Sequence, residues 1–201
     1  MDAGAEIVAE FGPESLTMEG VALRAGVSKA LPYQHFEDAE DLLVALAVRE
    51  AAAVAERISA VFGEDHPLRD GLSKSLAAYF DVVAERGVLM GALLQYRFSP
   101  SRQLAVDEIW ARIAEFFAQR FRAESSLPPP LCLAAAYIML AAVVGAQQTW
   151  INGLVSRRAV EELLLHMTVD GLAGLSTRKT EAKAVSLNGS KSRVPAASRG
   201  T

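Results

Sequence analysis

The sequence predicts an all-helical protein in which a small N-terminal domain precedes a larger helical one. Just over half of its 201 residues are hydrophobic (51%), and Ala and Leu, which favour helices, are abundant. Apolar residues recur at intervals of three and four over long segments, which glycines, prolines and capping residues separate. A chain of this length buries a core of its own. We place the two domains at residues 1–46 and 47–174, followed by a tail at 175–201.

Two short helices joined by a tight turn are predicted between residues 17 and 36. Thr17 is a good N-cap for the first helix, and Gly26 can end it in the left-handed conformation. Ser28 is the expected cap of the second helix, which runs over 29–35 with Pro32 early enough to be tolerated. Helices this short must pack on neighbours. The layout matches a helix-turn-helix, whose second helix enters the major groove of DNA.

A set of residues around this unit carries a specific resemblance: Gly12, Thr17, Val21, Ala22, Ala25, Gly26, Val27, Ser28, Tyr33, His35, Phe36, Leu42 and Leu43. Their joint spacing resembles the N-terminal domain of the tetracycline-repressor (TetR) family over about the first fifty residues. The alternative is a generic αα-hairpin in a helical enzyme, which requires the whole pattern to arise by chance.

Position within the helix-turn-helix predicts the DNA contacts. Thr17 would offer its hydroxyl and nearby N–H groups to a phosphate, and Tyr33 resembles the family's backbone-contacting tyrosine. Gln34 could pair with adenine and Leu31 could touch a thymine methyl, although Leu31 could instead pack in the core. His35 could equally be a capping or packing histidine. The full predicted set is Thr17, Ser28, Lys29, Ala30, Leu31, Tyr33, Gln34 and His35.

The formal net charge of −4 is unevenly distributed along the chain. Residues 1–50 hold ten acidic and three basic residues, a charge of −7, whereas residues 176–201 hold six basic and one acidic, a charge of +5. An acidic front weighs against strong phosphate attraction, but helix N-termini and hydroxyls also hold phosphates, and a dimer contributes two copies.

Two departures from the family pattern bear on DNA affinity. The predicted first helix, residues 3–11, lacks the basic residues that usually precede it in the family, because of either a misassigned start or a missing N-terminal arm. Ala39 stands where the family often has a lysine, which removes one phosphate contact.

Further helices are expected over residues 38–62, 68–86, 88–96, 101–123, from 131 past Asn152, and 159–172. Residues 131–146 carry no charge, but a membrane span needs about twenty apolar residues, so we expect a buried interface helix and no membrane partner. The resemblance implies that the last two helices pair with their copies in a homodimer. Their small and apolar residues are Ala134, Ala135, Met139, Ala142, Val143, Ala146, Leu163, Leu164, Met167 and Leu172.

The resemblance also implies a small-molecule effector that shifts the spacing of the two reading helices. Mostly apolar residues could line its cavity, which suggests a hydrophobic ligand, although aromatics at helical spacing are more often plain core. Gln147, a polar residue in an apolar helix, is the better hint, unless it bonds across the dimer. The candidates are Tyr79, Met90, Leu94, Tyr96, Trp110, Phe117, Tyr137, Gln147 and Trp150.

The sequence contains little that indicates catalysis or cofactor binding. The sequence has no Gly-x-Ser-x-Gly elbow, Gly-rich phosphate loop or His-Glu-x-x-His motif, and Cys132 has no histidine at metal-ligand spacing. We therefore expect no enzyme activity, metal or cofactor, and a cytoplasmic location. The tail should be a disordered basic segment, either inert or weakly DNA-attracting.

These observations predict a homodimeric, ligand-responsive regulator, most simply a repressor, that reads a palindromic double-stranded DNA operator. The alternatives are a helical small-molecule-binding dimer that holds DNA weakly or not at all, and a helical enzyme. A strong salt dependence of DNA retention would distinguish the DNA-binding regulator from the small-molecule-binding dimer.

Overall fold

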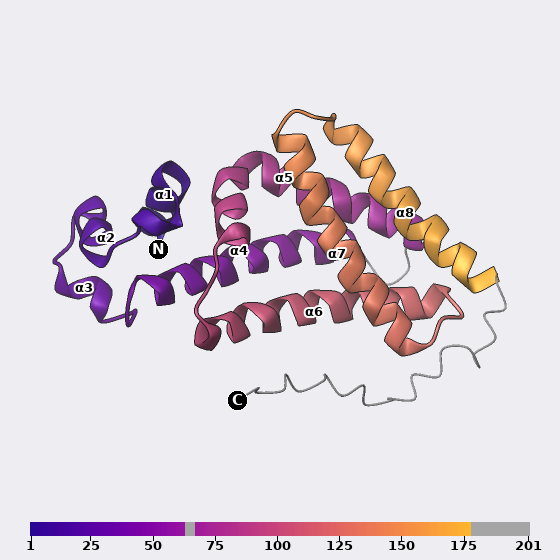
Figure 1. Cartoon of the computed structure of the whole chain (residues 1–201), viewed down its shortest axis with the longest axis horizontal. Helices are drawn as coiled ribbons and strands as arrows, with labels where there is room; N and C mark the ends of the chain where they lie inside the picture. The colour runs from indigo at the N-terminus through magenta and orange to yellow at the C-terminus, as the bar shows by residue number, and fades with distance from the viewer. Residues whose placement is uncertain (63–66, 178–201) are drawn as a thin grey trace, which may run out of the picture.

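The computed structural model describes residues 1–62 and 67–177, and all regular structure in these two ranges is helical, which confirms the predicted fold class (Figure 1). The helices α1 to α3 form one end of an elongated molecule, and α7 and α8 lie side by side toward the other end. The elements are α1 (Asp2–Phe11), the 3-10 turn η1 (Pro13–Ser15), α2 (Met18–Ala25), α3 (Ala30–Tyr33), α4 (Ala39–Val61), α5 (Leu68–Gln95), α6 (Pro100–Glu124), α7 (Pro129–Ile151) and α8 (Arg157–Thr177).

The first short helix of the predicted pair, α2, has the expected caps. The Gly20 amide donates to Thr17 Oγ1 at 3.0 Å, and Gly26 adopts a left-handed conformation with φ 68°. The Val27 amide then bonds to the Ala22 carbonyl at 3.0 Å and closes the helix end. A residue other than glycine at position 26 would be strained in this conformation.

The second short helix, α3, is a single turn, shorter than the predicted 29–35. Lys29 is its N-cap residue, without a side-chain capping bond, so the prediction that Ser28 caps this helix is wrong. Pro32 has no N–H with which to bond the Ser28 carbonyl, and this carbonyl accepts from the Leu31 amide instead. The Gln34 amide also bonds three residues back, which tightens the end of the turn.

Helix α4 begins as the sequence predicts. The Asp41 amide donates to Asp38 Oδ1 at 2.8 Å, and Asp41 Oδ2 accepts from the Glu37 amide at 3.0 Å. This reciprocal arrangement is a variant of the capping box, displaced by one residue. The helix continues without a break through residue 46, so the domain boundary there remains a prediction.

The core of the N-terminal part extends into α5. Apolar residues of α1, α2 and α4 enclose it, and Leu89 and Leu93 of α5 complete it. Its buried members are Ile7, Val8, Leu16, Val21, Leu42, Leu43, Leu46, Leu89 and Leu93. The end of α5 is therefore shared between the small domain and the larger one.

Helix α5 is continuous, whereas two helices separated at Gly87 were predicted, and that division is wrong. A glycine inside a helix costs about 1 kcal/mol relative to alanine. Burial of Val83 before it and Leu89 after it outweighs that cost, since each buried apolar side chain contributes about 1.5–3 kcal/mol.

The larger core lies among α4 to α8 and is centred on aromatic rings. Phe62, at the end of α4, packs against Phe116 and Phe117 of α6 with ring centroids 5.9 and 6.2 Å apart. Gly71 allows α5 to approach Phe62, because a Cβ at this position would lie 2.0 Å from the ring.

Helix α6 lies close to its predicted range. Helix α7 ends at Ile151, so the prediction that it continues past Asn152 is wrong, and α8 extends to Thr177, five residues beyond its predicted end. Residues 175–177 are therefore helical and not part of a disordered tail, and the rest of the predicted tail lies outside the described residues.

Among the described helices, α7 alone is long and apolar enough to cross a membrane by length and composition, with a mean hydropathy of 1.9. Cys132, Ala136, Met139 and Val143 are buried on the side of α7 that faces the protein. A helix with one face in a soluble core and an apolar outer face is also typical of a subunit interface.

Candidate nucleic-acid interface and effector cavity

The predicted DNA contacts are exposed residues of α2, α3 and their flanks, which we call the α2–α3 surface and define as Thr17, residues 28–31 and residues 33–35. All eight predicted contact residues are exposed. The side chains of Leu31 and Tyr33 are 37% and 51% exposed, so Leu31 is not a core residue. Val21 is buried in the N-terminal core, and Phe36 packs at the edge of the same core, so both belong to the packing beneath this surface.

Positive charge on the α2–α3 surface is scarce. Arg24 is turned toward α1, where it bonds Glu10 at 2.8 Å and lies 3.7 Å from Glu6. Lys29 is exposed and forms no ion pair with any described residue. Lys29 is therefore the cation that this surface offers to a phosphate.

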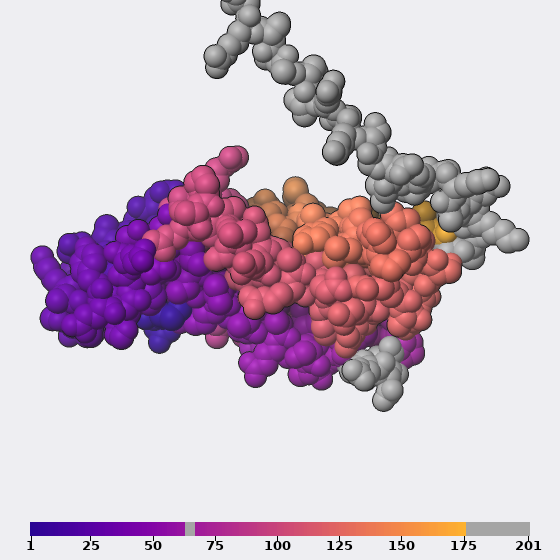
Figure 2. All heavy atoms as spheres, turned by 90° about the horizontal axis from the view of Figure 1, so that it is seen from below, coloured from indigo at the N-terminus to yellow at the C-terminus, as the bar shows by residue number. Residues whose placement is uncertain are grey.

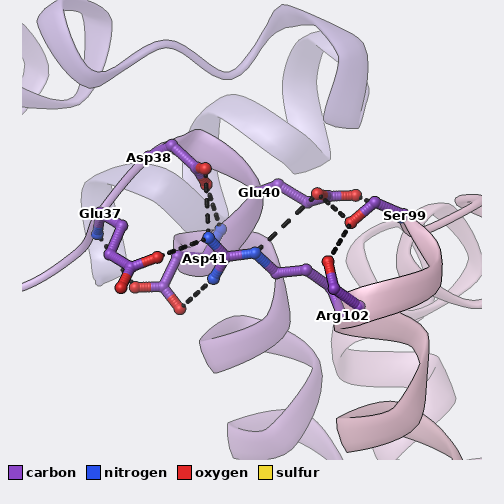
Figure 3. A network of polar contacts seen from close by, with 7 residues as sticks. Glu37, Asp38, Glu40, Asp41, Ser99 and Arg102 are labelled. Carbon is purple, nitrogen blue, oxygen red and sulfur yellow. Dashed lines mark hydrogen bonds and ion pairs between the residues drawn. The ribbon is translucent and has the colours of Figure 1, made fainter.

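A network around Arg102 joins the start of α4 to the start of α6 (Figure 3). The Arg102 guanidinium bonds Asp41 at 2.7 Å and both Glu37 and Asp38 at 3.1 Å. Glu40 accepts hydrogen bonds from the Ser99 amide at 2.6 Å and the Ser99 hydroxyl at 2.7 Å. Burial alone would lower the pKa of Arg102, but the charges of Asp38, Asp41 and Glu37 raise it above its usual value.

An apolar cavity of about 260 Å³ lies among α4, α5, α6 and α7. Six of the nine predicted ligand residues line it: Tyr79, Met90, Leu94, Tyr96, Trp110 and Phe117. Helix α4 also contributes to the wall through Glu50, Val54 and Ile58, which the sequence reasoning did not assign. Glu50 is the one charged residue in a series with Val54 and Ile58, spaced by four residues. This pattern in the sequence could have placed Glu50 on the inner face of α4.

Glu50 is a charged group on the edge of this apolar space. Its side chain is 4% exposed, and its carboxylate is held by Arg49 Nε at 3.1 Å and Arg86 Nη1 at 3.0 Å. A buried carboxylate is stable only when it is paired in this way. The pairing joins α4 to α5 beside the cavity.

The other three predicted ligand residues do not line the cavity. Gln147 is fully buried behind Tyr79, whose hydroxyl donates to Gln147 Oε1. Trp150 packs edge-on against Phe80 at 5.5 Å. Tyr137 is exposed on the outer face of α7, because it lies about 100° around the helix from its buried neighbour Ala136.

Helices α7 and α8 each expose a stripe of small or apolar residues at helical spacing. On α7 the stripe consists of Ala134, Ile138, Ala141 and Gly145, and on α8 it includes Ala159, Leu163 and Met167. Ile138 is 70% exposed and Met167 60% exposed. Met139, Val143, Leu164 and Leu172, which were predicted for the dimer face, are instead buried inside the protein.

Comparison with known proteins places the N-terminal part in a family. Residues 1–46 match the family model described as bacterial regulatory proteins, tetR family. An uncharacterized HTH-type transcriptional regulator from Mycobacterium bovis is 24% identical over 119 residues, which span 55% of this chain and 61% of that protein.

Solved structures show the same fold over most of the chain. The transcriptional regulator FadR from Bacillus subtilis, solved in complex with stearoyl-CoA, is 19% identical with a TM-score of 0.70, over 85% of this chain and 96% of that one. A protein described as a TetR-family transcriptional regulator from Rhodococcus sp. is 25% identical with a TM-score of 0.67, over 85% and 94% of the two chains. The capped helix-turn-helix, the all-helical architecture and these matches agree: residues 1–46 match the tetR family of bacterial regulatory proteins, and the chain as a whole shares the fold of these solved regulators.

Proposed function

We propose that this protein is a cytoplasmic DNA-binding transcription regulator, most simply a repressor, whose homodimer reads a palindromic operator. The observation that carries the proposal is the α2–α3 surface, on which all eight predicted contact residues are exposed within a capped helix-turn-helix. In this proposal Lys29 neutralises a phosphate, Gln34 reads a base, and Thr17 places its hydroxyl near the backbone.

The homodimer forms through the outer stripes of α7 and α8. Helices α7 and α8 lie toward the end of the molecule away from α2 and α3 (Figure 1), and Figure 2 shows the N-terminal helices at one end of the elongated molecule. Pairing through α7 and α8 would therefore leave both reading surfaces free. A four-helix interface with small residues on α7 allows close helix packing. Two reading helices about one DNA turn apart then require a palindromic operator.

The effector that releases DNA is an apolar small molecule bound in the cavity. The cavity volume of about 260 Å³ lies just below the range of roughly 300–1,000 Å³ that is usual for ligand sites, and its wall is mainly hydrophobic and aromatic. The similar FadR proteins are described as a regulator of fatty acid degradation and as a complex with stearoyl-CoA. We therefore propose an acyl chain as the first ligand to test.

A DNA-retention experiment tests the proposed function. Purified protein is mixed with its own upstream DNA and with random-sequence duplex DNA, at about 50 mM and about 200 mM salt. We expect retention that falls with salt, and a strong loss of retention in the double variant Lys29→Ala, Gln34→Ala. Lys74→Ala is the matched control, because Lys74 is an exposed lysine on α5, outside the α2–α3 surface.

Two results contradict the proposal. Failure of the native protein to bind either DNA at both salt concentrations would favour a small-molecule-binding dimer. Equal weakening by Lys74→Ala and by the double variant would show that the α2–α3 surface does not contact DNA.

A further inference from the structure

The chain places four carboxylates directly after the DNA-reading turn. Glu37, Asp38, Glu40 and Asp41 follow His35 within six residues, and the Glu37 side chain is 85% exposed. Phosphates at the α2–α3 surface lie within reach of these charges, since exposed charges interact over about 8–10 Å at moderate salt. Left uncompensated, this cluster would repel the DNA that the neighbouring residues bind.

One cation from the other half of the molecule offsets part of the negative charge of this cluster. Arg102, at the start of α6, extends toward α4 and bonds Glu37, Asp38 and Asp41, as Figure 3 shows. Its side chain is 18% exposed, so the contact is partly shielded from solvent and less screened by salt than a surface pair. Glu40 is occupied by both donors of Ser99.

Local basic residues do not perform this role. Arg24 is engaged by Glu6 and Glu10, and Lys29 pairs with none of the four carboxylates. Residue 39, between two of these acids, is alanine. The positive charge that pairs with the carboxylates at the start of α4 therefore comes from α6.

We propose that Arg102 sets the DNA affinity of this protein by offsetting one of the negative charges that Glu37, Asp38 and Asp41 place at the edge of the α2–α3 surface. The inference rests on the proposed DNA-binding function. It assigns a DNA-affinity role to a residue that lies outside the helix-turn-helix and contacts no base. Removing the guanidinium charge exposes on the order of one additional negative charge per subunit to the DNA phosphates.

The test compares DNA retention of the native protein and Arg102→Gln on random-sequence duplex DNA. We expect about tenfold weaker binding at about 50 mM salt and a smaller difference at about 200 mM, because salt screens the uncovered carboxylates. Arg112→Gln is the matched control. It makes the same charge change on α6, ten residues and about 15 Å farther along the helix.

A rescue experiment separates charge from positioning. Glu37→Gln, added to Arg102→Gln, removes one negative charge for the one positive charge that is lost, and it leaves the Asp38 cap of α4 intact. Binding should therefore return to within about twofold of the native protein. If Arg102 acted only by holding α4 in place, this double variant would remain weak and the deficit would not shrink with salt. That result would overturn the proposal.

The remaining outcomes are also decisive. If Arg102→Gln binds DNA as tightly as the native protein, this inference is wrong and the proposed function still holds. Native protein that binds no DNA contradicts both. Weakening by Arg112→Gln equal to that by Arg102→Gln would show a general effect of net charge and would overturn the specific role of Arg102.

Discussion

Tyr79 and Gln147 form a polar pair between α5 and α7 in mainly apolar surroundings. The Tyr79 hydroxyl donates to Gln147 Oε1, while Gln147 Nε2 has no hydrogen-bond partner among the described residues. Burial raises the pKa of Tyr79 well above its usual value, so the phenol stays protonated and remains a donor. Tyr79 lines the cavity and Gln147 lies directly behind it, which makes Gln147 a structural neighbour of the proposed ligand site.

Replacing Tyr79 by Phe should destabilise the protein by about 1–3 kcal/mol, because the fully buried Gln147 amide then loses its partner. The measurement is urea unfolding of the native protein, Tyr79→Phe, Gln147→Leu and the double variant. We expect the double variant to lose less than the two single variants combined, since it leaves no unpaired amide. Additive losses would show that the two side chains do not interact in solution.

At the scale of helices, the cavity is lined by residues of four helices, α4, α5, α6 and α7, and each helix contributes at a different point along its length. Tyr96 and Phe98 flank the end of α5, and Gln103 and Val106 lie on the first turns of α6. Arg102 is the immediate neighbour of Gln103, so the cavity wall and the carboxylate network share the start of α6. A bound ligand that displaces this turn would also affect the charge balance beside the DNA-reading surface.

The two tryptophans allow a test of the cavity. Trp110 lines the cavity, whereas Trp150 packs on Phe80 and does not. Addition of stearoyl-CoA should change the intrinsic fluorescence of the native protein and of Trp150→Phe, because an acyl chain would displace water from around Trp110. Free coenzyme A is the ligand control.

The same addition should leave the fluorescence of Trp110→Phe almost unchanged. A response that follows Trp150 instead would place the acyl chain outside the cavity. No response in any variant, with unchanged DNA binding, would exclude an acyl chain as the effector.

At the scale of the whole molecule, the proposed reading of a palindromic operator requires two copies held at a set distance. The apolar stripes of α7 and α8 would be unusual on the surface of a soluble monomer. Helix α4 runs from the N-terminal part to the cavity wall, and α5 contributes Leu89 and Leu93 to the N-terminal core. The smaller and larger parts are therefore packed together across the predicted boundary at residue 46.

Met167→Glu should convert the dimer to a monomer at micromolar concentration and abolish retention on palindromic DNA. The new carboxylate would be buried against its own copy near the centre of the proposed interface, where an unpaired charge is costly. Sedimentation velocity measures the change. Leu104→Glu is the control, because Leu104 is 63% exposed on α6, outside the α7 and α8 stripes. A Met167→Glu protein that sediments as a dimer would place the interface elsewhere.

The sequence by itself determined the all-helical class, the capped α2 with its left-handed Gly26, and the exposed residues that follow it. Each of these depends on neighbours within a few positions, where capping, helical periodicity and glycine conformation decide the outcome. The length of α3 was not predicted: the helix is a single turn, Ala30–Tyr33, and the amides of Gln34 and His35 bond three residues back at its end.

The tertiary structure decided the features that depend on distant residues. Burial on both sides of Gly87 kept α5 continuous against a local preference for a break. The rotation of α7 against α5 and α6 keeps Tyr137 and Trp150 out of the cavity. The same rotation turns Met139 and Val143 inward and away from the outer face of α7. The contact of Arg102 with Asp41 joins residues 61 positions apart, and packing of α6 against α4 creates it where no local pattern could show it.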